Sequence, residues 1–355
     1  MDVGKPAIGP FSQKSGLITT PLSRCTAELS PEKSPLSEWR GDTLSICRGE
    51  QLSFSCVPSV KVEVESLDAD RRLSEVPLHA MAVQMNQAVE NHLAAYPQLL
   101  ERVQSLGFSG EDLDKALHFV DQEAPVTINF PPVINHGGKS ESIFAALTED
   151  GHYQSLWERG SRPRHPKAPK RSKSDFLFKE SNTFVGQYNR ATPEERPHYG
   201  ALNFLNAPEG GAAVYGPGVL ILKGAVKERT SYQPRDSRFT DMKTVGFSKF
   251  MAGCLLSKQD DDLRQLLEVA TGRKASGTYG PDNHPQAFRG SNYIEAHIHG
   301  EVELSKDLAG VALHRRYRGT ATEADARKMA DKYQVPLSWY GGNGFVADTD
   351  EFILA

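Results

Sequence analysis

The segment SNYIEAHIHGEVEL, residues 291–304, constrains the fold more than any other stretch, because polar and apolar residues alternate along it. Successive side chains of a β-strand point to opposite faces of a sheet. The polar side chains should therefore share one face, namely Tyr293, Glu295, His297 and His299. The apolar residues between them should face a core, namely Ile294, Ala296 and Ile298. The pattern predicts a strand with a polar row on one side, where a binding or catalytic site is expected.

Composition excludes several classes of protein. The chain has 355 residues, of which 38% are hydrophobic and 24% charged, as in ordinary globular proteins. A formal net charge of −4 does not indicate a nucleic-acid partner. No apolar run approaches the roughly 20 residues that span a bilayer, so no membrane partner is expected. The four cysteines form no C-x-x-C pair, which argues against a zinc knuckle or a disulfide framework and favours a reducing compartment.

The N-terminal region differs from the rest of the chain. Residues 1–60 contain twenty Ser, Thr or Pro, and their apolar residues follow no helical or strand period. Such a segment buries too little surface to offset the entropy of ordering it. We therefore expect a disordered leader over 1–70 and a folded domain over 71–355. No basic region followed by an apolar one begins the chain, so no cleavable secretory signal is predicted.

Within the folded domain, the pattern predicts an N-terminal helical region over about 76–122. Its first helix covers 79–107, with a break or a new helix at Pro97. Its second covers 109–120 and is capped by Ser109, with Asp112 three residues on. Further helices are predicted at 141–160, 258–272 and 321–333. Strands are predicted at 126–130, 199–205, 218–223, 228–232, 293–300, 308–313 and 335–339.

Because strands gather late and helices early, the expected fold class is α+β rather than a doubly wound sheet. Residues 161–174 hold six basic residues and three prolines without an acid. We interpret them as a solvated loop. A phosphate-binding flap and a nuclear-localisation patch are the alternatives.

A metal site is one hypothesis for the polar row. His297 and His299, with Glu303 four residues on, resemble the first motif of cupin metalloenzymes, and two imidazoles with a carboxylate suit iron or manganese. Two features argue against this alternative. The spacing from Gly290 to His297 is one residue longer than the motif, and the only later histidine, His314, lacks cupin-like surroundings. We therefore predict that no metal is bound.

A wider set of motifs points to another family. The blocks occur in a fixed order, namely APVTINF (124–130), GHYQSLWERGS (151–161), ERPHYGALNF (195–204), GPGVLILKGAVKERTSYQPRDS (216–237), YIEAHIHGEVEL (293–304), YRGT (317–320) and VPLSWY (335–340). Together they resemble a bacterial family catalogued as a domain of unknown function, which includes CteC-type effectors. These effectors are ADP-ribosyltransferases that modify threonine in ubiquitin. The resemblance runs from Ala124 to the C-terminus.

The resemblance implies an ADP-ribosyltransferase-like split β-sheet core with an N-terminal helical region. It implies that NAD is the substrate and that ADP-ribose is transferred to a threonine of host ubiquitin, which blocks ubiquitination. The protein would be a secreted bacterial effector that acts in the host cytoplasm, and the leader would hold its export signal. The family's catalytic pair matches Asp236 and Glu295, with Ser237 completing the Asp-Ser motif. Relatives often carry Gln where this chain has His297.

The chemistry suits these residues. Loss of nicotinamide leaves positive charge on the ribose, which a preorganised carboxylate such as Glu295 can stabilise. Asp236 could fix the cofactor or act as a general base for the acceptor hydroxyl. Cofactor contacts are expected from Arg196, Tyr199, Asn203, Ser237 and Tyr293. The structural alternatives are that Arg196 forms a surface ion pair with Glu194 or Glu195 and that Tyr199 belongs to the core. Two functional alternatives are a binding module without activity and a transferase with another protein target.

Overall fold

A sheet of eight strands organises the part of the chain that the computed structural model describes, which is residues 73–136, 139–155, 157–158, 177, 180–237, 244–279 and 292–341. All of these residues belong to one unit, Ser59–Ala355. The strands of the sheet are β1 (Val126–Phe130), β4 (His198–Leu202), β5 (Gly218–Leu222), β6 (Thr230–Gln233), β7 (Gly246–Phe247), β8 (Ile294–Ile298), β9 (Leu308–His314) and β10 (Leu337–Tyr340). The predicted leader and the basic segment 161–174 lie outside the described residues.

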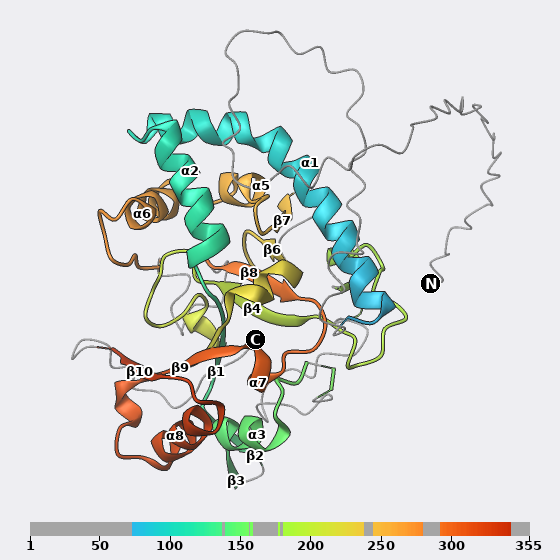
Figure 1. The fold of residues 1–355 in the computed structure, drawn as a ribbon, viewed down its shortest axis with the longest axis vertical. Helices are drawn as coiled ribbons and strands as arrows, with labels where there is room; N and C mark the ends of the chain where they lie inside the picture. The colour runs from blue at the N-terminus through green and yellow to red at the C-terminus, as the bar shows by residue number, and fades with distance from the viewer. Residues whose placement is uncertain are drawn as a thin grey trace, which may run out of the picture. The chain divides into compact units, whose positions relative to one another are not determined.

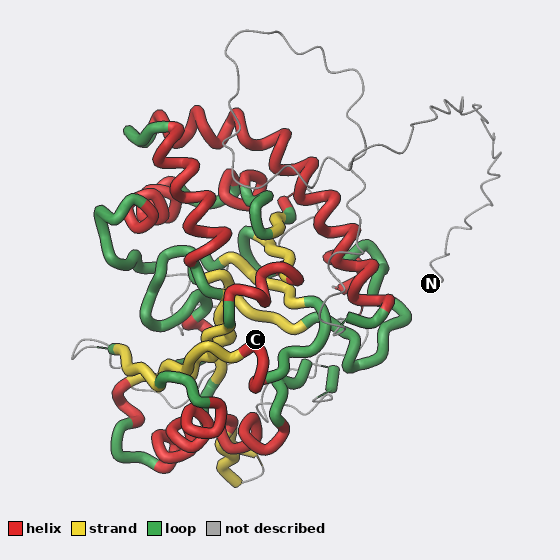
Figure 2. The backbone as a smooth tube through the Cα atoms, viewed as in Figure 1, coloured by secondary structure: helices red, strands yellow, loops and turns green. Residues whose placement is uncertain are grey.

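The strand order is β10-β9-β5-β1-β4-β8-β6-β7. Figure 1 labels most of these strands, and Figure 2 shows the strands in yellow. Neighbouring strands are antiparallel except β9 and β10, which are parallel. A separate two-stranded sheet pairs β2 (Val133–His136) with β3 (Lys139–Ser142). The strand that carries the polar row, β8, is hydrogen-bonded on both sides, to β4 and to β6. A strand held from both sides is a rigid support for a site.

The helices are α1 (Glu75–Ser105), α2 (Gly110–His118), α3 (Ile143–Asp150), α5 (Ala252–Leu256), α6 (Asp260–Ala270), α7 (Leu304–Asp307) and α8 (Ala321–Tyr333). A π-helical turn, η3 (Phe119–Glu123), continues α2, and a 3-10 helix, η5 (Gly224–Arg229), leads into β6. Helix α1 packs on α5 and β7, whereas α3 and α8 pack together at the β9 end of the sheet (Figure 1). The fold is therefore mixed, with a large sheet and packed helices, as the sequence pattern predicted at this level.

One large core joins the sheet to the helices. It includes Ile294, Ala296 and Ile298 of β8, which confirms the predicted apolar side of this strand. Helices contribute to it as well, for example through Leu113 of α2 and Met329 of α8. Full burial of such aliphatic side chains stabilises the fold by about 1.5–3 kcal/mol each.

The opposite face of the sheet carries a band of polar side chains. Strand register sets Thr127 of β1, Ala201 of β4, Glu295 of β8 and Gln233 of β6 in one row across the strands. The next row holds Tyr199 of β4, His297 of β8 and Ser231 of β6. Phe184 and Tyr188 pack over the histidines of β8 and against Ala80 of α1. The polar band is therefore buried rather than solvated.

Two helix predictions were wrong. Helix α1 continues through Pro97 instead of breaking there, because residues on both sides of the proline, such as Ala88 and Leu99, are buried and hold the helix in place. The helix predicted over 141–160 ends at Asp150, because Gly151 adopts a left-handed conformation with φ 79° and caps it. The capping box of Ser109 and Asp112 is confirmed.

Candidate active site

Glu295 is the second residue of β8 and is only 6% exposed. Its Oε2 atom accepts a hydrogen bond of 2.6 Å from the backbone N–H of Ser237. The same oxygen lies 3.1 Å from Nε2 of His297, which donates when Nε2 carries the proton. These contacts fix one carboxylate oxygen in position on a rigid strand.

Asp236 lies three residues beyond the end of β6 and is also 6% exposed. The hydroxyl of Tyr215 donates to its Oδ2 atom at 3.4 Å and lies 2.7 Å from the hydroxyl of Tyr293. The next residue is Ser237, whose N–H contacts Glu295. The structure thus joins the two acids that sequence analysis selected from segments far apart in the chain.

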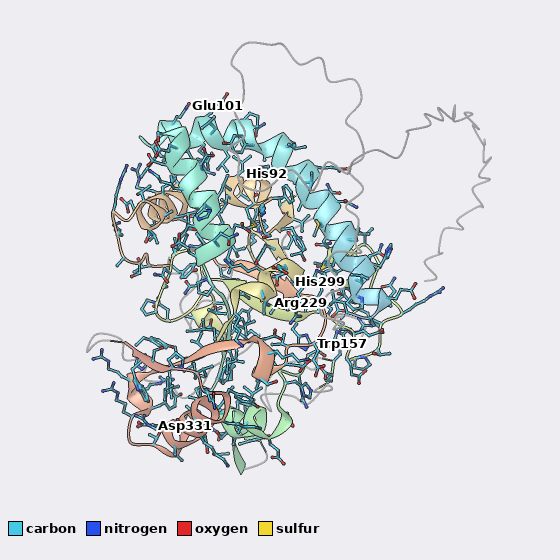
Figure 3. All side chains as sticks on the ribbon, viewed as in Figure 1. His92, Glu101, Trp157, Arg229, His299 and Asp331 are labelled. Carbon is cyan, nitrogen blue, oxygen red and sulfur yellow. The ribbon has the colours of Figure 1, made fainter. Side chains whose placement is uncertain are left out.

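His299, labelled beside Arg229 in Figure 3, is fully buried. It makes contacts through both ring nitrogens. Nδ1 lies 2.7 Å from the Tyr188 hydroxyl, and Nε2 lies 3.1 Å from Oγ of Ser231. Burial, together with the nearby charges of His297 and Arg229, lowers the pKa of His299 to about 3. Arg229 donates to the backbone oxygen of His299 at 2.6 Å. His299 is therefore a neutral packing partner of the site.

His297 is also fully buried, and its ring lies edge-on to Tyr199 at 5.3 Å between centroids. Within the described residues, its Nδ1 atom has no hydrogen-bond partner. A buried polar atom without a partner is costly unless a ligand or water satisfies it. The ring that carries this atom contacts Glu295 through its other nitrogen, so the arrangement fits a site that takes a polar ligand such as a sugar.

The residues of the metal alternative do not assemble. Of the residues that the structure describes, no three His, Cys, Asp or Glu side chains form a group that could hold a metal ion. Glu303 is the residue just before α7 and pairs with Lys306 at 2.8 Å, while both nitrogens of His299 contact other side chains. The donor set of His297, His299 and Glu303 is therefore not brought together.

Arg196 is buried and forms an ion pair with Glu180. Its guanidinium also lies 4.1 Å from the centre of the Trp157 ring, and Trp157 Nε1 donates to Glu180 at 2.5 Å. Burial raises the pKa of Glu180, against the lowering effect of Arg196. The alternative of a surface pair with Glu194 or Glu195 was wrong, because the observed partner is Glu180 and the pair is internal.

The other residues predicted to contact the cofactor, Tyr199, Asn203 and Tyr293, differ in their surroundings. Tyr199 is half-buried beside His297, and its hydroxyl lies 3.5 Å from Glu180. Asn203 lies just beyond β4 and closes a turn, donating to the Ala207 oxygen at 2.8 Å and accepting from the Ala207 N–H at 2.9 Å. Tyr293 is buried against Tyr215. Tyr199 and Tyr293 thus lie near the carboxylates, whereas the Asn203 amide serves the turn.

Sequence analysis missed two residues that support this site. One is Tyr215, which links Asp236 to Tyr293. The other is Lys258, a buried lysine between α5 and α6 whose ammonium group donates to backbone oxygens two or three residues before each acid. Neither stands in a motif that indicates such a role, so nothing in the local sequence points to them.

Chemically, the arrangement offers two buried acids of fixed position beside tyrosine hydroxyls and an imidazole with one open nitrogen. Such acids can accept hydrogen bonds from sugar hydroxyls and stabilise positive charge in a transition state. Of the described residues, none belongs to a helix long and apolar enough to cross a membrane.

Comparisons with known proteins place the chain in a wider context. The model of a family described as "Protein of unknown function (DUF3626)" matches residues 126–352. No curated protein matches the chain. The matched range contains the four strands that form the polar band, β1, β4, β6 and β8, together with Asp236 and Glu295.

Proposed function

The chain belongs to the DUF3626 family, and we propose that it is a mono-ADP-ribosyltransferase that uses NAD as its substrate. One observation carries this proposal, namely the junction of Asp236 and Glu295 through the Ser237 N–H. Two acids chosen for their match to a transferase motif lie at the ends of neighbouring strands, and both are almost fully buried.

The proposed reaction breaks the bond between ribose C1′ and the nicotinamide nitrogen, and nicotinamide leaves with the bonding electrons. The acceptor hydroxyl oxygen then bonds to C1′, and its proton passes to a carboxylate. Glu295 accepts a hydrogen bond from a ribose hydroxyl and stabilises the positive charge that develops on the sugar. Asp236 orients the acceptor hydroxyl and takes its proton as a general base. Tyr199, Tyr293 and the open nitrogen of His297 offer contacts to the nicotinamide-side ribose and its ring.

The finer parts of the proposal rest on the resemblance to CteC-type effectors. They are an ADP-ribosyltransferase-like sheet core, a threonine of host ubiquitin as acceptor, and a bacterial effector that is secreted and acts in the host cytoplasm. A transferase of this class with a different protein target is equally compatible with the geometry around Asp236 and Glu295.

The test is incubation of the full chain with isotopically labelled NAD and ubiquitin, followed by mass spectrometry of both proteins. We expect ubiquitin to gain one ADP-ribose on threonine. If label appears on another protein of a host lysate but not on ubiquitin, the result supports the transferase activity and assigns it a different protein target. NAD that is neither consumed nor transferred would favour a binding module without activity.

The same assay tests the metal alternative. Because the donors of His297, His299 and Glu303 are not assembled, we expect transfer to be unchanged by EDTA. Loss of activity with EDTA that iron or manganese restores would favour the cupin-like enzyme instead.

A further inference from the structure

We propose that Lys258 is the positioning residue of this site, and that its ammonium group holds the ends of β6 and β8 at the separation that the two acids require. The inference rests on the proposed function of Asp236 and Glu295. It extends that function to a residue that touches neither acid and that no motif indicates.

The contacts of Lys258 carry the argument. Its Nζ atom donates to the backbone oxygen of Pro234 at 2.9 Å, two residues before Asp236. It also donates to the backbone oxygen of Asn292 and lies 3.5 Å from that of Tyr293, two residues before Glu295. One cation therefore joins the chain segment that precedes one acid to the segment that precedes the other.

The register of the strands shows why such a link is needed. β6 and β8 are paired only as far as Gln233 and Glu295, so the ladder ends where the two acids begin. Beyond that pair, no ladder hydrogen bonds between β6 and β8 fix the distance between the segment after Gln233 and the segment before Glu295. A lysine has three N–H groups and no acceptor, so it can satisfy three carbonyl oxygens at once. Burial of this lysine is otherwise unfavourable, which argues that the contacts compensate for it.

The charge of Lys258 is expected to respond to pH. Burial lowers its pKa to about 8. The groups that act on it are Asp262 of α6 and Cys254 of α5, which raise the pKa, and Arg235 after β6, which lowers it. A neutral amine keeps only two N–H groups, so one carbonyl contact is lost above that pH. Burial raises the pKa of Cys254 to about 12, so this neighbour does not titrate in the same range.

The chain offers a matched control in Lys227. This lysine is also buried, donates to the backbone oxygens of Val120 and Asp121 at 2.9 Å, and has a pKa that burial lowers to about 8. Its contacts join η5 to η3 rather than the two acids. Lys258→Met and Lys227→Met therefore each remove one buried ammonium group and its hydrogen bonds to backbone oxygens, at two different places in the fold.

The experiment compares both variants with the wild-type full chain, using NAD and the acceptor protein well below each melting midpoint. Lys258→Met should lower kcat by roughly 10–100-fold, as expected for reacting groups displaced by about an ångström, with KM for NAD nearly unchanged. Lys227→Met should keep kcat within about threefold of wild type. Equal kcat values for the two variants overturn the inference.

Two further measurements keep the inference testable. If Lys258→Met does not fold, Lys258→Arg retains the charge at high pH. The loss of rate that we expect for wild type above pH 8 should then be absent, and its persistence overturns the inference. If wild type transfers nothing, the proposed function fails. Hydrogen exchange at the Ser237 amide then tests the positioning role of Lys258 without any measurement of activity. Lys258→Met should accelerate this exchange, and Lys227→Met should not. Equal exchange rates in the two variants overturn the role of Lys258.

Discussion

The backbone N–H of Ser237 donates to Oε2 of Glu295 at 2.6 Å, so the turn that carries Asp236 is tied directly to the strand that carries the glutamate. The bond spans 58 positions in sequence. A hydrogen bond to an ionised acceptor contributes more than one between neutral groups, about 1.5–3 kcal/mol. This hydrogen bond couples the position of Asp236 to that of Glu295.

Glu295→Gln should fold normally and bind NAD nearly as well as wild type, because the amide keeps the size of the side chain and an oxygen that accepts from Ser237. Its transfer rate should fall by roughly a hundredfold, since one preorganised negative charge is lost. Mass-spectrometric rates with labelled NAD measure the effect. A variant that retains the wild-type rate on every acceptor would remove β8 from the catalytic machinery.

Asp236→Asn should also lose most of its activity, and the double variant should be little worse than the worse single one, because residues that act as a unit are not additive. His297→Gln serves as the matched control on the same strand, since its amide N–H can still donate to Glu295. We expect this variant to be milder than either acid variant. Full additivity of the two acid substitutions would argue against a joint role.

Arg196→Met should destabilise the fold, because it leaves the Glu180 carboxylate buried without its cation. Breaking a buried pair in this way costs about 3–5 kcal/mol. The double variant with Glu180→Gln should recover part of this loss in urea unfolding. Arg327→Met is the control, because Arg327 pairs with Glu323 at the surface and its loss should hardly move the midpoint. Weaker NAD binding at unchanged stability would instead support the predicted phosphate contact of Arg196.

Tyr215→Phe should reduce transfer by a few-fold up to about tenfold, since it removes one hydrogen bond to Asp236 and one to Tyr293. Tyr333→Phe is a suitable control, because within the described residues its hydroxyl has no hydrogen-bond partner. Steady-state rates of the two variants, measured side by side, give the comparison. Equal rates would show that the Tyr215 hydroxyl does not support Asp236.

Acid should destabilise the fold through His299. Its pKa is lowered from 6.5 to about 3 in the folded state, so between these values the unfolded chain binds a proton that the folded chain does not. The free energy of unfolding therefore falls as pH decreases below 6.5, by up to about 1.4 kcal/mol per pH unit. His299→Gln should flatten this slope in urea titrations from pH 7 to pH 4. His79→Gln, at an exposed position of α1, should leave the slope unchanged.

Removal of residues 1–70 should leave the melting midpoint and the in vitro activity intact, because the composition of this region predicts no packed structure. The new end precedes Ser74, whose hydroxyl donates to Glu195 at 2.6 Å and should be retained. Calorimetry of both chains checks the first expectation and the transfer assay the second. A large drop in midpoint would contradict the interpretation of this region as a leader.

Periodicity in the sequence was enough to predict the central strands and the face of the 293–300 strand that carries Glu295, whereas Asp236 was selected only by the family resemblance. The two-residue period of 293–300 placed Ile294 toward the core and Glu295 away from it, as the structure has them. What periodicity could not indicate is that the polar side is buried as well. That burial comes from Phe184 and Tyr188, which lie more than a hundred residues earlier and carry no signal of what they cover.

Long-range polar contacts were the part that local patterns could not predict. Lys258 opens the charged run KQDDDLRQLL and was predicted only as the first residue of a helix over 258–272, yet the oxygens that it contacts lie 24 and 34 positions away. Arg196 stands beside two glutamates but pairs with Glu180, 16 positions earlier. Which of several oxygens a cation contacts depends on how strands and turns meet in space, and this is not encoded in the neighbouring residues.

The position of β8 between β4 and β6 has a consequence for how the protein is made. Both β4 and β6 precede β8 in sequence, so during synthesis they leave the ribosome before the strand that pairs with them. Until then, two inner edges of the sheet present unpaired backbone groups, which favour association with other chains. A nascent or truncated chain that ends before residue 294 would therefore lack Glu295 and leave the facing edges of β4 and β6 unpaired, so the proposed catalytic carboxylate and the protection from aggregation are gained in the same folding step.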